Sequence, residues 1–275
     1  MDEQQLQLFR ETVWTYYREH GRYDLPWRLP EPDGTFDAYK IMVSESMLQQ
    51  TQVPRVIPKF ESFIALFPTA QTLAEASLAD VLRAWNGLGY NRRAKFLWQA
   101  AQQVMATFGG VLPHDRAALQ SLPGIGPNTA GAIMAYAYNA PETFIETNIR
   151  TVFIHHFFSD SQEVSDAALA PLIVATLDIE QPREWYWALM DYGTHLKQTV
   201  GNASRASKSY AKQSAFVGSK RRIRGAVLRL LAERAYTKAE LDAHISDERL
   251  PTVLSDLERE GFITKRDAAY HLGTA

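Results

Sequence analysis

One ten-residue stretch, LPGIGPNTAG at 122–131, constrains the fold of this chain more than any other. Gly124 and Gly126 allow a tight connection and leave the backbone N–H groups around them uncovered. Pro127 suits the first turn of a second helix, where its missing N–H group is not needed. Because uncovered amides at a helix N-terminus bind anions, the pattern predicts either a grip on a nucleic-acid phosphate or a tight turn inside a helical bundle.

The first 197 residues show helical spacing of apolar side chains and almost no strand alternation, so we expect an all-α body. The first helix carries Leu6, Phe9, Val13 and Tyr17 on one face. Further helices are expected at 38–52, from Val56 to Phe67, at 72–85, from the glycine turn 87–93 to Met105, from 144–150 to Phe158, and over about 165–177 and 182–197.

Composition narrows the class of protein. The chain has 275 residues, 46% hydrophobic and 22% charged, which fits one large or two modest globular domains. It contains no cysteine, which excludes disulfides, thiolate zinc sites and cysteine-ligated iron–sulfur clusters. Its acidic start lacks the apolar core of a signal peptide, and no apolar run is long enough to span a membrane. We therefore expect a cytoplasmic protein with no membrane association.

A basic run stands out against the net charge of −2. Residues 198–224 contain Lys and Arg but no Asp or Glu. Such a run is either a solvated linker or an electrostatic track for a DNA backbone. Beside a phosphate-binding hairpin we favour the track, with Lys212, Arg221 and Arg222 among its DNA contacts.

The last 51 residues, 225–275, show the pattern of a separate small domain. Three helices are expected, the second opened by a capping box at 237–240, and a two-stranded wing follows at 261–272. This order resembles a winged helix, whose third helix reads DNA in many such modules. Here the third helix carries three acids beside the single Arg259, so docking or backbone contact is the favoured use.

Two carboxylates have surroundings suited to chemistry. Glu45 lies in the otherwise uncharged stretch 44–52, so packing would raise its pKa toward that of a general acid. Glu146 follows an apolar pair at an expected helix start. Either could instead be an acid that complements a helix dipole. A pair of carboxyl groups with separated pKa values is what cleavage of an N-glycosidic bond needs, one protonating the leaving base and one facing the sugar.

Four segments, 44–52, 87–90, 122–131 and 146–150, occur in the order found in adenine DNA glycosylases of the MutY type. The chain from Leu6 to Lys197 resembles this branch of the helix-hairpin-helix (HhH-GPD) glycosylase superfamily, which also includes endonuclease III. The resemblance implies a mainly α fold with a two-lobed glycosylase body at 1–197, a basic DNA-contact segment at 198–224 and the winged-helix-like domain at 225–275.

The resemblance also implies roles for single residues. Glu45 matches the acid that protonates the departing base, and Gln50 matches the wedge that fills the gap left in the duplex. Glu146 stands where the family has an aspartate facing the sugar, and Asn148 matches the asparagine that assists it. The expected base-pocket residues are Trp27, Arg28, Asn128 and Asp191. The expected DNA contacts from the body are Gln50, Gly89, Tyr90, Asn91, Gly124, Gly126 and Thr129.

Alternatives remain for several of these positions. For Trp27 a core aromatic is the favoured interpretation over a pocket contact, and for Asp191 the alternative is an acid on a helix surface. Asn128 stands where lyase members carry a lysine, so we expect a monofunctional glycosylase that forms no Schiff base. Asn91 stands where the family has a tyrosine that enters the duplex beside 8-oxoguanine. Lys197 stands at the first of the four missing cluster cysteines.

The sequence therefore predicts a monomeric DNA glycosylase of base excision repair. Its expected partner is double-stranded DNA with a mispaired or damaged base, and the expected product is adenine released from a mispair, with 8-oxoguanine as a candidate opposite base. We expect no metal site and no cofactor, except for a monovalent cation at the hairpin carbonyls. The alternatives are release of another base such as a pyrimidine, a non-catalytic DNA-binding protein, and a helical interaction scaffold. The glutamate at position 146 is one methylene longer than the family's aspartate, which leaves the activity open.

Overall fold

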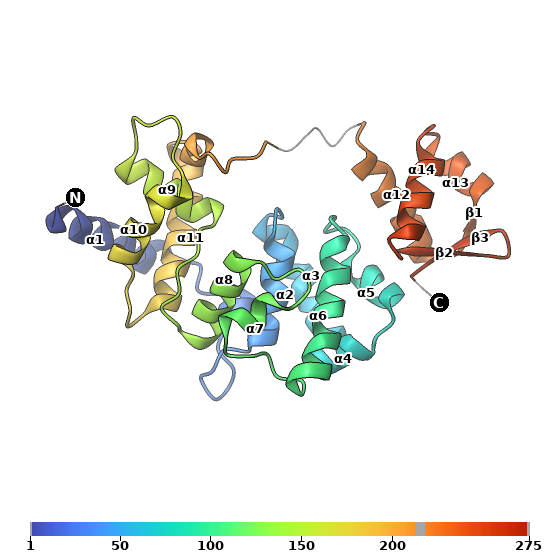
Figure 1. Ribbon diagram of the computed structural model, residues 1–275, viewed down its shortest axis with the longest axis horizontal. Helices are drawn as coiled ribbons and strands as arrows, with labels where there is room; N and C mark the ends of the chain where they lie inside the picture. Colours follow the sequence, from blue (N-terminus) through green and yellow to red (C-terminus); the bar gives the residue numbers. More distant parts are fainter. Residues whose placement is uncertain (1, 213–217, 274–275) are drawn as a thin grey trace. The chain divides into compact units, whose positions relative to one another are not determined.

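A computed structural model describes residues 2–212 and 218–273, and Figure 1 shows its helices and its small sheet. The described chain is mainly α, as predicted. It divides into two compact units, and each is described by itself. The first unit is built from Met1–Glu45, Pro113–Ser121 and Ile125–Lys212, and the second from Ser46–Leu112, Leu122–Gly124 and Gln213–Ala275, as far as these ranges are described. Among the described helices, none combines the length and apolar character that a bilayer crossing requires.

The first unit is entirely helical in its regular elements. In chain order these are α1 (Glu3–His20), the 3₁₀ helix η1 (Pro26–Arg28), α2 (Ala38–Leu48), α7 (Arg116–Gln120), α8 (Pro127–Tyr138), α9 (Thr147–Phe157), α10 (Asp166–Thr176), α11 (Pro182–Thr199) and η2 (Ala203–Ala206). The last residues of α2 belong to the second unit. Helices α1, α9, α10 and α11 pack together (Figure 1), and Phe9 of α1 meets Phe153 of α9 with ring centroids 5.0 Å apart.

Two glycines let the helices of the first unit approach closely. A Cβ atom at Gly131 of α8 would lie 2.9 Å from the Cβ of Phe144. A Cβ atom at Gly193 of α11 would lie 2.6 Å from the carbonyl oxygen of Asn148, in the first turn of α9. These spacings are too short for any side chain, so glycine brings α11 and α8 against the segment that contains Glu146.

The second unit combines helices with the sheet. Its elements are α3 (Val53–Leu66), α4 (Ala70–Glu75), α5 (Leu78–Trp85), α6 (Arg92–Phe108), α12 (Lys220–Glu233), β1 (Tyr236–Thr237), α13 (Lys238–Ile245), α14 (Leu250–Arg259), β2 (Ile263–Arg266) and β3 (Ala269–Leu272). Phe63 and Trp85 are fully buried at its centre, with ring centroids 6.0 Å apart. Helices α4 and α5 begin at the side-chain caps Thr69 and Ser77, which accept backbone N–H groups of the first turn.

The helix predicted to reach Gln52 ends earlier, at Leu48. Gln50 adopts a left-handed conformation with φ of 57°, which no helix interior allows. Arg93 donates hydrogen bonds of 2.5–2.9 Å to carbonyl oxygens of the helix end and the following turn. The next helix starts at once, with Pro54 in its first turn. The sequence prediction was wrong here because a distant arginine, rather than a local signal, ends α2.

The hairpin of the sequence analysis connects α7 to α8. Asp115 caps α7 by accepting the N–H of Ala118 at 2.7 Å. Gly124 has φ of +78°, so this glycine is required by the turn. Gly126 is the N-cap of α8 with φ of −84°, and a Cβ atom there would meet nothing within 4 Å. Gly126 is therefore dispensable for the backbone, and its open surroundings leave the α8 amides uncovered.

The C-terminal module (residues 218–273) has three helices and the antiparallel sheet β1–β3–β2. The predicted capping box is present, because Thr237 and Glu240 exchange side-chain-to-backbone hydrogen bonds at the start of α13. Its first helix, α12, begins at Lys220 rather than near Gly225. The helix starts earlier because buried Ile223 extends the apolar face of α12 by one turn before Val227, the first apolar residue of our prediction.

Candidate active site

Two carboxyl groups from distant parts of the chain meet in the first unit. Glu45 lies on α2, and Glu146 is the N-cap residue of α9. Burial raises the pKa of both groups, and the charge of Glu146 raises the pKa of Glu45 further. Both residues nevertheless keep partial exposure, as expected for groups that line a site open to a substrate. The structure thus brings together the two acids that the sequence singled out.

The surroundings of the two acids differ. Arg150 and Lys197 both lower the pKa of Glu146 and so oppose the effect of burial. Arg28 lowers the pKa of Glu45, but its guanidinium is already paired with Asp191. Two neighbouring carboxylates cannot both ionise easily, and the one with nearby cations loses its proton first. We therefore assign the proton of the pair to Glu45 and the negative charge to Glu146.

Lys197 of α11 reaches the start of α9. Its Nζ donates to Oδ1 of Asn148 at 2.5 Å, and Nδ2 of Asn148 lies 3.4 Å from Oγ1 of Thr194. Burial lowers the pKa of Lys197 to about 8, although the charge of Glu146 opposes that shift. Asn148 is thereby held by two side chains of α11, next to the glycine at 193 that allows the close approach.

Arg150 is fixed one turn after Glu146. It forms two hydrogen bonds of 2.7 Å to the carboxylate of Asp166, the first residue of α10. These contacts lower the pKa of Asp166, which therefore remains ionised. A doubly bonded guanidinium has little freedom, so its charge stays close to Glu146.

Asp191 is buried and forms ion pairs with Arg22 and Arg28. The alternative interpretation of Asp191 as an acid on a helix surface was therefore wrong. Asp191 is 3% exposed, and it accepts 2.8 and 2.9 Å hydrogen bonds from Arg28 and 2.5–2.8 Å bonds from Arg22. Burial alone would raise the pKa of Asp191, but these arginines outweigh it and lower the pKa. Nε of Arg28 is buried and has no hydrogen-bond partner in the described structure.

Sequence reasoning missed an aromatic wall of the site. Tyr136 of α8 is buried, and burial together with the charges of Glu45 and Glu146 raises its pKa well above the usual value. Its ring stacks on Trp187 with centroids 5.9 Å apart, and Arg28 lies 5.3 Å from the Trp187 ring. A large polar aromatic within the small-residue run 130–137 was the available signal.

Asn128 and Trp27 have structural contacts. Both polar atoms of the Asn128 side chain bind the backbone of Ile145: Nδ2 donates to the carbonyl at 2.9 Å, and Oδ1 accepts the N–H at 3.2 Å. Asn128 therefore ties the start of α8 to the residue before Glu146, whereas we expected its amide to face the base. Trp27 is 7% exposed in the core of the first unit, as its alternative interpretation requires.

The predicted DNA contacts are divided between the units. Gly126, Thr129 and Lys212 belong to the first unit. The second unit holds Gln50, Gly89, Tyr90, Asn91, Gly124, Arg221 and Arg222. Within the second unit, Arg221 donates to the Tyr90 hydroxyl at 2.7 Å, so the basic run and the loop before α6 meet.

The described residues include no group of three or more His, Cys, Asp or Glu side chains placed to hold a metal ion. The iron–sulfur cluster implied by the resemblance needs cysteine thiolates, and the chain has no cysteine. The residues present therefore do not fit that cluster, and no step of the chemistry below uses one.

Comparison with known proteins agrees with these features. Residues 43–172 match the family described as HhH-GPD superfamily base excision DNA repair protein. The chain is 34% identical over 252 residues to an adenine DNA glycosylase of Mycobacterium tuberculosis, covering 82% of this chain and 80% of that protein. It is 43% identical over 161 residues to the adenine DNA glycosylase of Mycolicibacterium smegmatis, covering 58% of this chain and 51% of that protein. The chain spans about half the length of several of its curated relatives.

Two solved structures share the fold. A thermostable thymine-DNA glycosylase matches with a TM-score of 0.60 and 23% identity, covering 70% of this chain and 87% of that one. Endonuclease III in a non-covalent complex with DNA matches with a TM-score of 0.61 and 14% identity, covering 72% and 89%. The chain belongs to the HhH-GPD superfamily of base excision DNA repair proteins, in the family of the adenine DNA glycosylases.

Proposed function

We propose that this protein is a DNA N-glycosylase that hydrolyses the bond between adenine and deoxyribose in duplex DNA. The observation that carries the proposal is the meeting of Glu45 and Glu146 in one site with unequal surroundings. The relatives named adenine DNA glycosylases support the choice of base. The nucleotide must leave the helical stack to reach both acids, as base-modifying enzymes require.

Glu45 is proposed as the general acid. Burial and the charge of Glu146 raise its pKa, which favours the protonated carboxyl that can donate a proton to the departing base. A protonated base is a better leaving group, because the electrons of the glycosidic bond move onto a neutral rather than an anionic product. Replacement by glutamine removes the proton but preserves the shape of the side chain.

Glu146 is proposed as the carboxylate that faces the sugar. The breaking bond leaves positive charge on C1′ and the ring oxygen, and a nearby negative charge stabilises that state. Arg150 and Lys197 lower the pKa of Glu146 against the effect of burial and so favour its ionised form, and Asn148 is oriented beside it by Lys197. A water molecule then adds to C1′, and the product is an abasic site with an intact strand.

Arg28 and the aromatic wall are proposed to contact the base. Nε of Arg28 is a buried hydrogen-bond donor without an acceptor. Such a donor is unfavourable unless a substrate supplies the acceptor. Trp187 lies beside the Arg28 guanidinium and provides a flat apolar surface. An acceptor nitrogen on the edge of a purine would satisfy Arg28.

A panel of labelled duplexes with every mismatch, including adenine opposite 8-oxoguanine, tests the proposal. Alkaline cleavage after incubation reports each released base, and we expect cleavage at adenine. Release of pyrimidines alone would assign another substrate. Tight binding without release of any base, unchanged by Glu45→Gln, would instead favour a non-catalytic DNA-binding protein.

Further properties belong to the same proposal. The enzyme is expected to lack lyase activity, because position 128 is asparagine in this chain, whereas lyase members have there a lysine that forms a Schiff base. It is expected to act as a monomer inside the cell, where its DNA substrate lies. No redox cofactor is expected, and a monovalent cation at the hairpin carbonyls remains a prediction.

A further inference from the structure

A tyrosine of the aromatic wall lies against both acids of the site. Tyr136 of α8 is 5% exposed, and burial together with the charges of Glu45 and Glu146 raises its pKa. Arg28 and Tyr186 are the other titratable groups that act on it. Among the described tyrosines with a shifted pKa, only Tyr136 is influenced by either acid. Its phenol therefore belongs to the cluster of groups around the two carboxyls.

The ring of Tyr136 is fixed by its neighbours. It stacks on Trp187 with ring centroids 5.9 Å apart and an interplanar angle of 20°. It meets the ring of Phe144 edge-on, with centroids 6.0 Å apart and an angle of 83°. The backbone carbonyl oxygen of Tyr136 accepts a hydrogen bond from Nε of Arg183, which holds this part of α8. A ring packed in this way has little freedom, so its hydroxyl group stays within the cluster.

The hydroxyl group of Tyr136 is available as a hydrogen-bond donor. It makes no hydrogen bond to another described residue, whereas the hydroxyl group of buried Tyr186 donates to the carbonyl oxygen of Glu142 at 2.6 Å. Because burial raises the pKa of Tyr136 well above its usual value, the hydroxyl keeps its proton. A fixed donor of this kind stabilises negative charge that develops beside it during a reaction.

The proposed reaction creates a second negative charge in this cluster. Glu45 starts as a neutral acid and becomes a carboxylate when its O–H bond breaks and the proton moves to the departing base. Glu146 already carries a charge in that mechanism, and two carboxylates in one buried site repel each other. The guanidinium of Arg28 is shared with Asp191, to which it donates two hydrogen bonds. The new carboxylate of Glu45 therefore needs a further donor as it forms.

We propose that the hydroxyl group of Tyr136 donates a hydrogen bond to the carboxylate of Glu45 as this acid transfers its proton to the base. The inference rests on the proposed function, because it concerns the acid of that reaction. Tyr136 keeps its own proton throughout, and the electron pair of the glycosidic bond goes to the base. The water that adds to C1′ gives up the proton that restores the neutral acid. Tyr136 is thus a positioning residue that acts through Glu45.

Tyr136→Phe tests the hydroxyl group, because phenylalanine keeps the ring and its packing. Single-turnover release of adenine, with protein in excess over a labelled duplex, is measured across the pH range in which the protein is folded. Because a hydrogen bond to a charged group is among the stronger ones, we expect the maximal rate to fall by about 10–100-fold. Binding to a lesion-free duplex, measured by fluorescence anisotropy, should be unchanged.

The pH–rate profile separates this role from a structural one. A hydrogen bond to the carboxylate lowers the pKa of Glu45, so its loss raises that pKa and moves the basic limb of the profile to higher pH. The acidic limb, which follows ionisation of Glu146, should stay in place. An unchanged maximal rate would overturn the proposal. A slower reaction with both limbs in place, or with a shift of the acidic limb alone, would also overturn it, because the hydroxyl then acts on the base or on Glu146.

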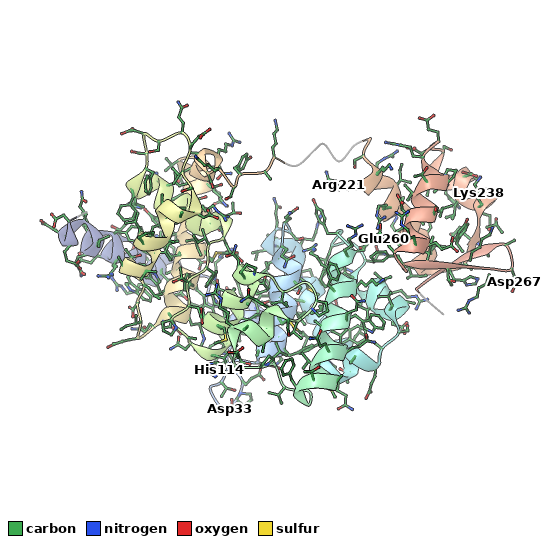
Figure 2. All side chains as sticks on the ribbon, in the orientation of Figure 1. Asp33, His114, Arg221, Lys238, Glu260 and Asp267 are labelled. Carbon is green, nitrogen blue, oxygen red and sulfur yellow. The ribbon has the colours of Figure 1, made fainter. Side chains whose placement is uncertain are left out.

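Tyr138→Phe is the matched control, because it removes a tyrosine hydroxyl group from the same helix. The ring of Tyr138 stacks on His114, which Figure 2 labels, with ring centroids 4.2 Å apart. Burial and the charge of Asp37 raise the pKa of Tyr138, and neither acid of the site contributes. We expect this variant to keep the maximal rate and both limbs. Equal shifts of the basic limb in the two variants would contradict the assignment to Tyr136.

A second variant covers the case in which Tyr136→Phe melts early. Replacement of Tyr136 by 3-fluorotyrosine nearly keeps the shape of the side chain and makes the hydroxyl group a stronger donor. The pKa of Glu45 should then fall, so the basic limb should move to lower pH, opposite to the shift expected for phenylalanine. A basic limb in the wild-type position would overturn the proposal.

A titration of the DNA-free protein separates this inference from the proposed function. NMR of protein with isotope-labelled glutamate carboxyl groups reports the pKa of Glu45, whose signal is identified by its loss in Glu45→Gln. We expect this pKa to be higher in Tyr136→Phe than in wild type or in Tyr138→Phe. If wild-type protein releases no base but the pKa rises in this way, only the proposed function fails. If wild-type protein releases adenine and neither the pKa nor the basic limb moves, only the inference about Tyr136 fails.

Discussion

At the scale of single residues, two identical carboxyl groups of the site differ in the charged residues beside them. Glu45 and Glu146 carry the same carboxyl group, yet the second has Arg150 and Lys197 beside it and the first shares only an arginine that is already paired. Unequal neighbours of this kind assign acid and base roles in many glycosidases. The sequence identified both acids from their local surroundings. It did not reveal the effect of Lys197, because this residue lies about fifty positions from Glu146 and only folding brings it near.

Glu45→Gln is expected to lose base release and gain stability. Loss of a general acid lowers rates by about 10²–10⁴-fold, measured here in single-turnover reactions with saturating protein. A carboxyl with a raised folded-state pKa destabilises the fold progressively as pH rises from its unfolded pKa toward the folded one. Glutamine removes that effect, so the variant should melt a few degrees higher at pH 8 and equally at pH 4. A lower melting temperature at pH 8 would contradict the buried, protonated state.

Lys197→Met is expected to change the pH profile of the reaction. Loss of this cation raises the pKa of Glu146, because one of the two groups that lower it disappears. Glu146 then stays protonated to higher pH, so the acidic limb of the pH–rate profile moves to higher pH. Lys197→Arg keeps the charge and should keep the limb near its wild-type position. Equal profiles for Lys197→Met and wild type would show that Lys197 does not act on Glu146.

At the scale of elements, close helix packing sets the geometry of the site. The sequence predicted most helices within a few residues, because apolar spacing and caps such as Thr237 are local signals. It did not predict that α2 ends at Leu48, since the carbonyl groups there are bound by Arg93 from another helix. Nor could it predict how closely α11 approaches α9, which depends on Gly193.

Gly193→Ala tests this approach. The added Cβ would lie 2.6 Å from the Asn148 carbonyl oxygen, so α11 must shift. We expect a loss of about 1–3 kcal/mol in the free energy of unfolding, as for other overpacked sites, together with slower base release because Asn148 moves. Gly225→Ala on α12 is the control: its Cβ meets nothing within 4 Å, and alanine should stabilise the helix by about 0.4–1 kcal/mol. Denaturant unfolding measures both.

Gly126→Ala tests the hairpin as a phosphate grip. The backbone there has φ of −84° and open surroundings, so the free energy of unfolding should stay within about 0.5 kcal/mol of wild type. A methyl group over the α8 amides should nevertheless weaken DNA binding, as measured by anisotropy. Undiminished affinity would indicate that the hairpin is only a turn between helices.

At the scale of the whole molecule, a net charge of −2 conceals local segregation of charge. Acids hold arginines in place, as Glu260 does with Arg92 and Arg224. The basic run was visible in the sequence. The pairing of Arg224 was not, because Arg92 lies far from Arg224 in the chain and they meet on the same carboxylate only after folding.

Glu260→Gln is expected to loosen the C-terminal module. The pKa of Glu260 is lowered to about 2, so its contribution to stability is complete above its unfolded pKa and is lost as pH falls toward 2. At pH 7.5 the variant should show faster amide hydrogen exchange at 92–95 and 257–263, and the difference from wild type should shrink below pH 4. Exchange rates equal to wild type at pH 7.5 would exclude the ion pairs of Glu260 with Arg92 and Arg224 as an anchor of the module.

The contact between Asn128 and Ile145 has a consequence for which nucleotide the proposed glycosylase acts on. Helix α8, whose exposed start is the expected phosphate grip, is tied by that amide to the residue just before Glu146. Arg116 of α7 adds a second tie, since it donates to the Thr143 carbonyl at 3.2 Å. Under the proposed function, these two ties hold the start of α8 and Glu146 at a fixed separation, so a phosphate bound at the hairpin would determine which sugar of the strand faces Glu146.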